Sequence, residues 1–170
     1  KIARQQDFDV MLLDISLPDR NGIDILKQIK KDRPNLAVLM LSMHNEHEFA
    51  IRALKAGAAG YLNKQSAPAQ LVVAIRQVAA GDKYVSPAVA QELANSINTD
   101  ADKPLYTTLS DREYQTLCFI AEGKTLSEIS AEMFLSPKTV SVYRARLLEK
   151  LSLNNNSELI RYAIKNKLVD

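Results

Sequence analysis

The chain has 170 residues, of which 46% are hydrophobic and 25% are charged, and its formal net charge at pH 7 is +2. This length and composition suffice for one or two globular domains with a buried core, and no apolar run is long enough to cross a bilayer. A single cysteine, Cys118, excludes a disulfide framework, and so small a net charge does not by itself indicate nucleic-acid binding.

The first half of the chain alternates apolar strand patterns with amphipathic helix patterns. Asp9 to Asp14 is an apolar run closed by an acid, Ala37 to Ser42 is a second buried run, and a short third strand is predicted within Gly57 to Lys64. Helices are predicted between and after these strands, at about 23–31, 46–56 and 69–80. Such alternation predicts a parallel sheet covered on both faces, with its working groups at the carboxyl ends of the strands.

Three side chains with complementary chemistry follow these strands: Asp14, Ser42 and Lys64. An aspartate can attack phosphorus, a hydroxyl can hydrogen-bond a phosphoryl oxygen, and an ammonium group can balance its charge. Each residue taken alone is more simply a surface side chain that ends a strand. All three in register, with Pro18 and Gly22 at four-residue steps after Asp14, favour a functional interpretation.

The middle of the chain leads from the sheet to a second set of helices. Ser86 and Pro87 can start a helix within residues 81–95, and the polar, aperiodic residues 96–104 are interpreted as a linker. Thr125 can cap a short helix over 126–133, and a tight turn then leads to Ser136. Two helices joined by so few residues are typical of a helix-turn-helix.

The second helix of this pair, Ser136 to Leu151, has the pattern of a DNA-reading helix. Ser136 can cap it, Pro137 suits its first position, and Val140 and Leu147 lie with Leu151 on one apolar side. The opposite side carries small or neutral residues flanked by basic and hydroxyl groups: Lys138, Thr139, Ser141, Val142, Ala145 and Arg146.

The charge of this helix is compatible with two interpretations. Four cations, Lys138, Arg144, Arg146 and Lys150, oppose Glu149 alone, a local excess that suits phosphate oxygens. An ordinary amphipathic helix with a solvated basic face explains the same residues equally well. The short capped helix before it favours the DNA-binding interpretation.

These segments resemble two bacterial families. The stretches at 9–26, 38–42 and 56–64 resemble the later strands of the receiver domain of two-component response regulators, a flavodoxin-like α/β fold. Residues 109–168, which open with LSDRE and place Gly123 where a left-handed residue closes a helix, closely resemble the LuxR-type output domain of the NarL/FixJ class. The resemblance implies a receiver over 1–81, a helix and linker over 82–104, and an all-α, four-helix domain over 105–170 with its helix-turn-helix at about 126–146.

The resemblance also implies roles for individual residues. Asp14 matches the aspartate that a sensor histidine kinase phosphorylates, Ser42 and Tyr61 match the switch positions, and Lys64 matches the invariant lysine. In the output domain, base edges are read at the positions of Ser141, Val142 and Ala145, while Lys138, Thr139 and Arg146 mainly meet phosphates. Partners implied by the family are double-stranded DNA and a second copy of the chain, bound through the last helix, which Asn156 is expected to cap.

One departure from the receiver family affects the metal site. A receiver opens with a strand that ends in a pair of acids holding Mg²⁺, and no such pair precedes Asp14. Asp14 would then be a partial metal ligand, Mg²⁺ is expected only for an intact receiver, and the sheet would expose an apolar face and a strand edge. Either the sequence is a fragment of a longer protein, which we favour, or the receiver is degenerate.

Three functions are compared on these grounds. The leading hypothesis is a cytoplasmic, DNA-binding transcription regulator controlled by phosphorylation, with no catalytic residues and no membrane partner. A regulator or interaction module that is independent of phosphorylation is the alternative. An aspartyl phosphohydrolase is less favoured, because Asp14-Ile15-Ser16 lacks the second acid of such enzymes and the helix-turn-helix would be unexplained.

Overall fold

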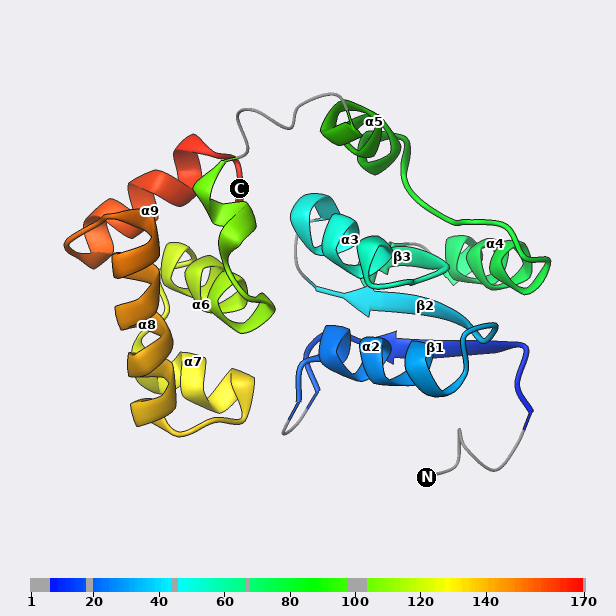
Figure 1. The fold of residues 1–170 in the computed structure, drawn as a ribbon, viewed down its shortest axis with the longest axis horizontal. Helices are drawn as coiled ribbons and strands as arrows, with labels where there is room; N and C mark the ends of the chain where they lie inside the picture. The colour runs from blue at the N-terminus through cyan, green and yellow to red at the C-terminus, as the bar shows by residue number, and fades with distance from the viewer. Residues whose placement is uncertain (1–6, 18–19, 44–45, 67, 98–103, 170) are drawn as a thin grey trace. The chain divides into compact units, whose positions relative to one another are not determined.

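The computed structural model describes residues 7–17, 20–43, 46–66, 68–97 and 104–169. The chain divides into two compact units, residues 1–15 with 22–95 and residues 16–21 with 96–170. Figure 1 shows the helices and strands of the two units, and each unit has its own buried core.

The first unit is built on a parallel sheet of three strands in the order β1-β2-β3. These are β1 (Val10–Asp14), β2 (Ala37–Ser42) and β3 (Gly60–Asn63). Leu12 pairs with Leu39, and Leu39 pairs with Gly60. The register therefore brings the carboxyl ends of all three strands to one edge of the sheet, as the alternating pattern predicts.

Helices cover both faces of this sheet. Leu39 and Leu62 pack against Ala74 and Val78 of α4 (Pro68–Ala79), while α2 (Gly22–Asp32) and α3 (Glu46–Lys55) pack on each other and on the outer strands. Met40, the neighbour of Leu39, is also fully buried. Because successive residues of a strand point to opposite faces, burial of both shows that both faces of β2 are covered.

The edge strand β1 is less protected than β2. Leu12 is 44% exposed, and Phe8 just before the strand is 41% exposed. The sequence predicts such apolar exposure for a three-stranded sheet, because an outer strand has neighbours on one side only.

A further helix, α5 (Pro87–Ile97), comes after α4 in the chain. The Ser86 hydroxyl accepts a hydrogen bond from the Val89 N–H at 3.3 Å, as a helix cap does, and Val89 is buried. The helix extends to Ile97, so it overlaps the start of the predicted linker at 96–104. Most of that linker, 98–103, lies outside the described residues.

The second unit is all helical. After a short 3₁₀ turn, η1 (Leu105–Thr108), come α6 (Asp111–Ala121), α7 (Leu126–Met133), α8 (Pro137–Leu151) and α9 (Asn156–Lys165). Helix α6 packs on the other three, and its residues from Glu113 to Ile120 are all buried. The four helices confirm the all-α domain that the sequence predicts. No helix in the described ranges is long and apolar enough to cross a membrane.

Local capping sets most of the helix ends in this unit. Ser110 with Glu113, and Thr125 with Glu128, form reciprocal capping boxes at the starts of α6 and α7. Ser136 accepts from the Thr139 N–H at 3.1 Å to start α8, which confirms the predicted cap. Gly123, at φ 83°, closes α6 in the left-handed region, as the sequence predicts.

The cap expected for α9 is wrong. Asn155, not Asn156, caps the helix, because Asn155 keeps an extended backbone and its Oδ1 accepts from the Glu158 N–H at 3.0 Å. Asn156 is the first helical residue. Leu159 and Ala163 of this helix are buried, whereas Ile164 is 57% exposed.

Candidate functional site

Two residues from the outer strands meet at the carboxyl edge of the sheet. Lys64, directly after β3, donates a hydrogen bond from Nζ to Oδ2 of Asp14, the last residue of β1, and the two form an ion pair. The Asp14 side chain is 25% exposed and that of Lys64 is 34% exposed. The carboxylate therefore lies beside a cation and within reach of solvent, as attack on a small phosphorus compound requires.

Ser42 and Tyr61 are held inside the sheet unit. Ser42 ends the central strand and is 1% exposed, and its carbonyl accepts the Lys64 N–H at 2.7 Å. Tyr61 is 3% exposed and pairs with Met40 across β2 and β3. The structure thus brings Asp14 and Lys64 into contact, joins Ser42 to the Lys64 backbone, and buries Tyr61 on β3, with β2 between it and the strand of Asp14.

The turn after β3 contains a residue that the sequence reasoning missed. The Asn63 side-chain oxygen accepts the Gln65 N–H at 2.8 Å, and the Asn63 carbonyl accepts the Ser66 N–H at 2.9 Å. Asparagine commonly closes turns in this way, which is the signal that could have identified it. With Lys64 bonded to the Ser42 carbonyl, these contacts fix the backbone from which the ammonium group reaches Asp14.

A glycine supports the other side of the site. The Gly22 N–H donates to the Ile15 carbonyl at 2.8 Å and closes the loop after β1. A Cβ at Gly22 would lie 2.0 Å from the carbonyl oxygen of Asp14, so the first turn of α2 approaches this strand end as only glycine permits. Pro18, the other residue of the predicted four-residue steps, lies outside the described residues.

The resemblance to receiver domains implies a Mg²⁺ site, and the described residues do not make a complete one. Within the described ranges, no three or more His, Cys, Asp or Glu side chains are grouped so that they could hold a metal ion. Asp14 offers one carboxylate, which is paired with Lys64. Mg²⁺ is usually held by one or two carboxylates together with substrate oxygens and waters, so Asp14 alone is a partial ligand set.

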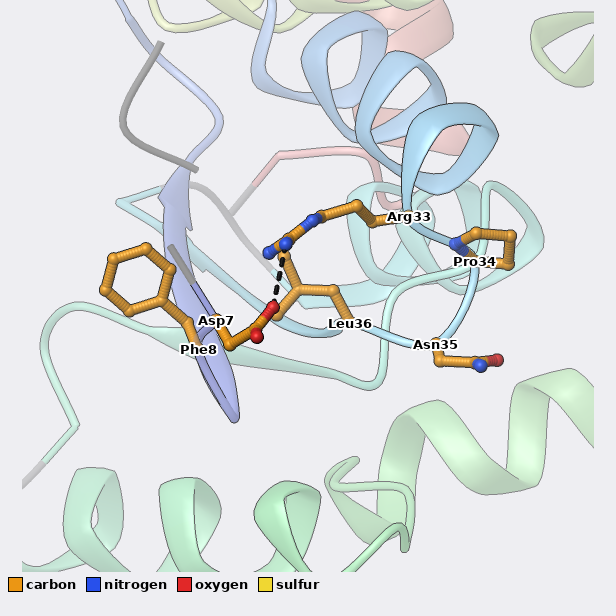
Figure 2. Close-up of a pocket in the computed structure, with 6 residues that line it drawn as sticks. All are labelled: Asp7, Phe8, Arg33, Pro34, Asn35 and Leu36. Carbon is orange, nitrogen blue, oxygen red and sulfur yellow. Dashed lines mark hydrogen bonds and ion pairs between the residues drawn. The ribbon is translucent and has the colours of Figure 1, made fainter. Parts of the chain in front are cut away.

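A shallow cavity of about 320 Å³ lies at the opposite, amino edge of the sheet (Figure 2). Its lining comes from the segments just before β1 and β2: Asp7, Phe8, Arg33, Pro34, Asn35 and Leu36. Arg33 Nη2 pairs with Asp7 Oδ1 at 2.9 Å across it. Because the cavity is at the far ends of the strands from Asp14, it has no part in the site described above.

In the second unit, α8 presents two contrasting sides. Val140, Leu147 and Leu151 are buried against the other helices. The opposite side exposes Lys138, Ser141, Val142, Ala145 and Arg146, with Thr139 half-buried at its margin. This is the arrangement predicted for a helix that enters a DNA groove, with small side chains in the centre and cations at the sides.

The four cations of α8 are not equivalent. Neither Lys138 nor Arg146 has a carboxylate partner among the described residues, so both are available to phosphates. Arg144 donates from Nε to Asn156 Oδ1 at 2.6 Å, and Lys150 donates from Nζ to Glu113 Oε2 at 2.7 Å. These two contacts give Arg144 and Lys150 partners inside the unit, which the periodicity of the sequence did not indicate.

Glu113 is the most enclosed of the described acids of this unit, with 2% exposure. Its Oε2 also accepts the Ser110 N–H at 2.8 Å. Burial raises the pKa of this carboxyl, but hydrogen bonds from Lys150 and Ser110 outweigh that effect and hold the pKa below its ordinary value. Glu113 is therefore a buried carboxylate that depends on Lys150 for its balancing charge.

Comparison with known proteins gives a consistent assignment. Residues 1–76 match the family described as the response regulator receiver domain, and residues 107–163 match the bacterial regulatory proteins of the luxR family. The chain is 37% identical to the response regulator UvrY of Escherichia coli over 169 residues, 99% of this chain and 78% of UvrY. It is also 37% identical to the response regulator GacA of Pseudomonas aeruginosa, over 100% of this chain and 80% of GacA.

Solved structures agree with these matches. Salmonella enterica RcsB, bound to the promoter rprA in the presence of a phosphomimetic, superposes with a TM-score of 0.54 at 26% identity, covering 93% of this chain and 76% of RcsB. A LuxR-family two-component response regulator from an Aurantimonas species gives a TM-score of 0.52 at 36% identity over 58% of this chain and 70% of that one. The relatives align with nearly the whole chain, and the two family matches fall on its two units. The chain therefore belongs to the NarL/FixJ-class response regulators, with a receiver followed by a LuxR-type helix-turn-helix domain.

Proposed function

We propose that this protein is a transcription regulator that binds DNA through α8 and is controlled by phosphorylation of Asp14, with no enzymatic turnover of its own. A sensor histidine kinase is the proposed phosphoryl source, and the protein acts in the bacterial cytoplasm. The observation that carries the proposal is the exposed side of α8. The small or neutral side chains of Ser141, Val142 and Ala145 lie between Lys138 and Arg146, two cations without a carboxylate partner among the described residues.

Direct reading of bases is expected to rest on few contacts. The Ser141 hydroxyl can hydrogen-bond a base edge, and Val142 and Ala145 can contact thymine methyl groups. Lys138 and Arg146 are expected to bind phosphates, which position the helix without reading sequence, and Thr139 can add a hydroxyl contact to the backbone. The resulting preference among operators is modest.

Control through the first unit is proposed from the pairing of Asp14 with Lys64. A carboxylate oxygen of Asp14 attacks phosphorus, a P–O bond forms as the bond to the donor histidine nitrogen breaks, and Lys64 then balances the added charge. Ser42 and Tyr61 are proposed to respond to the new phosphoryl group. The proposed domain limits are a receiver over 1–81, a helix and linker over 82–104, and a helix-turn-helix domain over 105–170.

A second copy of the chain is proposed to bind alongside the first on DNA, through α9. Exposure of Ile164 on that helix supports this proposal, because a large apolar side chain at 57% exposure gains from burial by a partner. RcsB, which resembles this chain over both units, has a solved structure bound to a promoter in the presence of a phosphomimetic, and this supports both DNA binding and its link to phosphorylation.

The proposal is tested with duplexes selected by the chain from a random DNA library. We expect enrichment of a sequence and a fall in affinity as salt rises. In the full-length gene product, acetyl phosphate with Mg²⁺ should raise affinity for that duplex, and Asp14→Asn should abolish the increase. No enriched sequence would refute DNA-specific binding.

A regulator that does not depend on phosphorylation is the second candidate. It is favoured by one observation: the described residues contain no group of three or more His, Cys, Asp or Glu side chains that could hold a metal ion. The two candidates differ in the Asp14→Asn experiment. Equal affinity with and without phosphodonor, in both the wild type and the variant, would support the second candidate.

A further inference from the structure

The reading helix α8 is joined to two different helices by polar contacts at its sides. Lys150 bonds Glu113 in the first turn of α6, and Arg144 bonds Asn156, the first residue of α9. Each residue turns an α-helix by about 100°, which separates Arg144 from Lys150 by roughly 120° around the axis. The buried residues Val140, Leu147 and Leu151 lie between them.

This placement resists rotation of α8 about its own axis. Apolar packing is non-directional and allows a helix to roll by small angles, whereas hydrogen bonds to charged groups have defined lengths and directions. A roll in either direction lengthens one contact or compresses the other. The two contacts therefore fix which side chains face outward.

We propose that Glu113 and Asn156 are positioning residues for DNA recognition, which act through Lys150 and Arg144 to fix the rotation of α8. This inference rests on the proposed function of α8. On this inference Lys150 makes an internal contact and does not bind a phosphate, although Lys150 is a cation on α8. If the Lys150 ammonium moved away from Glu113, a carboxylate with 2% exposure would be left without a cation, which is unfavourable.

The Asn156 contact has a separate logic. Asn155 already caps α9, so the Asn156 side chain is not required to start that helix. It is half-buried and is bonded by the Arg144 guanidinium through Nε. Loss of the Asn156 amide removes this contact while the charge of α8 stays the same.

The experiment compares variants on two duplexes, one selected by the wild-type chain and the same duplex with one base pair changed in the selected site. Lys150→Met should reduce discrimination between them by about fivefold, as when one base contact is weakened, while the slope of log affinity against log salt stays unchanged. Lys138→Met, the matched control, should lower that slope by about one unit. Lys150→Arg, which can still reach Glu113, should restore discrimination.

Two further variants separate positioning from stability. Glu113→Gln combined with Lys150→Met removes both charges, so the unfolding midpoint should recover relative to Lys150→Met, whereas discrimination should stay low. Asn156→Ala should also lose discrimination with an unchanged salt slope. If the salt slope of Lys150→Met falls as that of Lys138→Met does, Lys150 is a phosphate contact and the inference is overturned. Wild-type discrimination in Lys150→Met, in the double variant and in Asn156→Ala would also overturn it. Failure of the wild-type chain to select any duplex would instead overturn the proposed function.

Discussion

Replacement of Gly22 by alanine tests the geometry that surrounds Asp14. A Cβ at this position would lie 2.0 Å from the Asp14 carbonyl oxygen, and 2.8 Å from both the Asp14 carbonyl carbon and the Ile15 Cα. All three are main-chain atoms, so no side-chain rotation relieves the overlap. Ordinary contacts of a Cβ begin near 3.4 Å, so the strand end and the start of α2 have to separate.

We expect Gly22→Ala to destabilise the protein, whereas replacement of glycine by alanine in a helix usually stabilises it. Gly22 begins α2 and is not among the glycines with positive φ, and at such a position alanine commonly stabilises a protein by about 0.5–1 kcal/mol. Insertion of a methyl group into a well-packed region costs about 1–3 kcal/mol. Since the overlap here is with backbone, we expect Gly22→Ala to lower the free energy of unfolding by about 1–3 kcal/mol.

Urea unfolding of the full chain, followed by circular dichroism, measures this loss. Gly81→Ala is a control within the same unit, because a Cβ there has nothing within 4 Å and only the positive φ of 94° opposes it. We expect amide resonances of Asp14 and Ile15 to shift in Gly22→Ala and to stay in place in Gly81→Ala. A Gly22→Ala protein as stable as the wild type, with unshifted resonances, would refute the close approach of α2 to Asp14.

Three further predictions concern the helical unit. The pKa of Glu113 lies below its unfolded value, so its contribution to stability is present above the unfolded pKa and is lost as pH falls through the lower, folded pKa. Urea midpoints between pH 6 and pH 3 should therefore show a decline that is smaller in Glu113→Gln. Thr125→Ala removes the capping box of α7 and should cost about 1 kcal/mol in thermal or urea unfolding, and a loss below about 0.3 kcal/mol would argue against the cap. Lys138→Ala should weaken binding to all duplexes about equally and lower the salt slope by about one unit, whereas Val142→Ala should change operator preference by roughly 1 kcal/mol. If a binding series showed instead that Lys138→Ala changes operator preference and Val142→Ala does not, α8 would dock differently.

The features that the sequence predicts well are local or periodic. Thr125 and Ser136 cap helices through contacts within three residues, and the apolar runs before Asp14 and Ser42 form neighbouring parallel strands. Once the strands are parallel and adjacent, their carboxyl ends lie at one edge, which is why the meeting of Asp14 with Lys64 is foreseeable.

The features that it does not predict depend on contacts between distant parts of the chain. Glu113 and Lys150 are 37 residues apart, and no spacing rule relates an acid in one helix to a cation in another. Asn155 and Asn156 are chemically identical candidates for the cap of α9, and only the backbone conformation and the bond from Arg144 distinguish them.

The division of labour around α8 has a consequence for how such a protein can change its targets. The residues that hold α8 in place, such as Val140, Leu147 and Lys150, are different from the exposed residues proposed to read DNA, Ser141 and Val142. Substitutions at exposed positions usually alter stability by less than about 0.5 kcal/mol. The exposed residues of α8 can therefore be replaced one after another without loss of the folded domain, so new operators can be acquired gradually. A combinatorial library at these positions should yield mostly folded members.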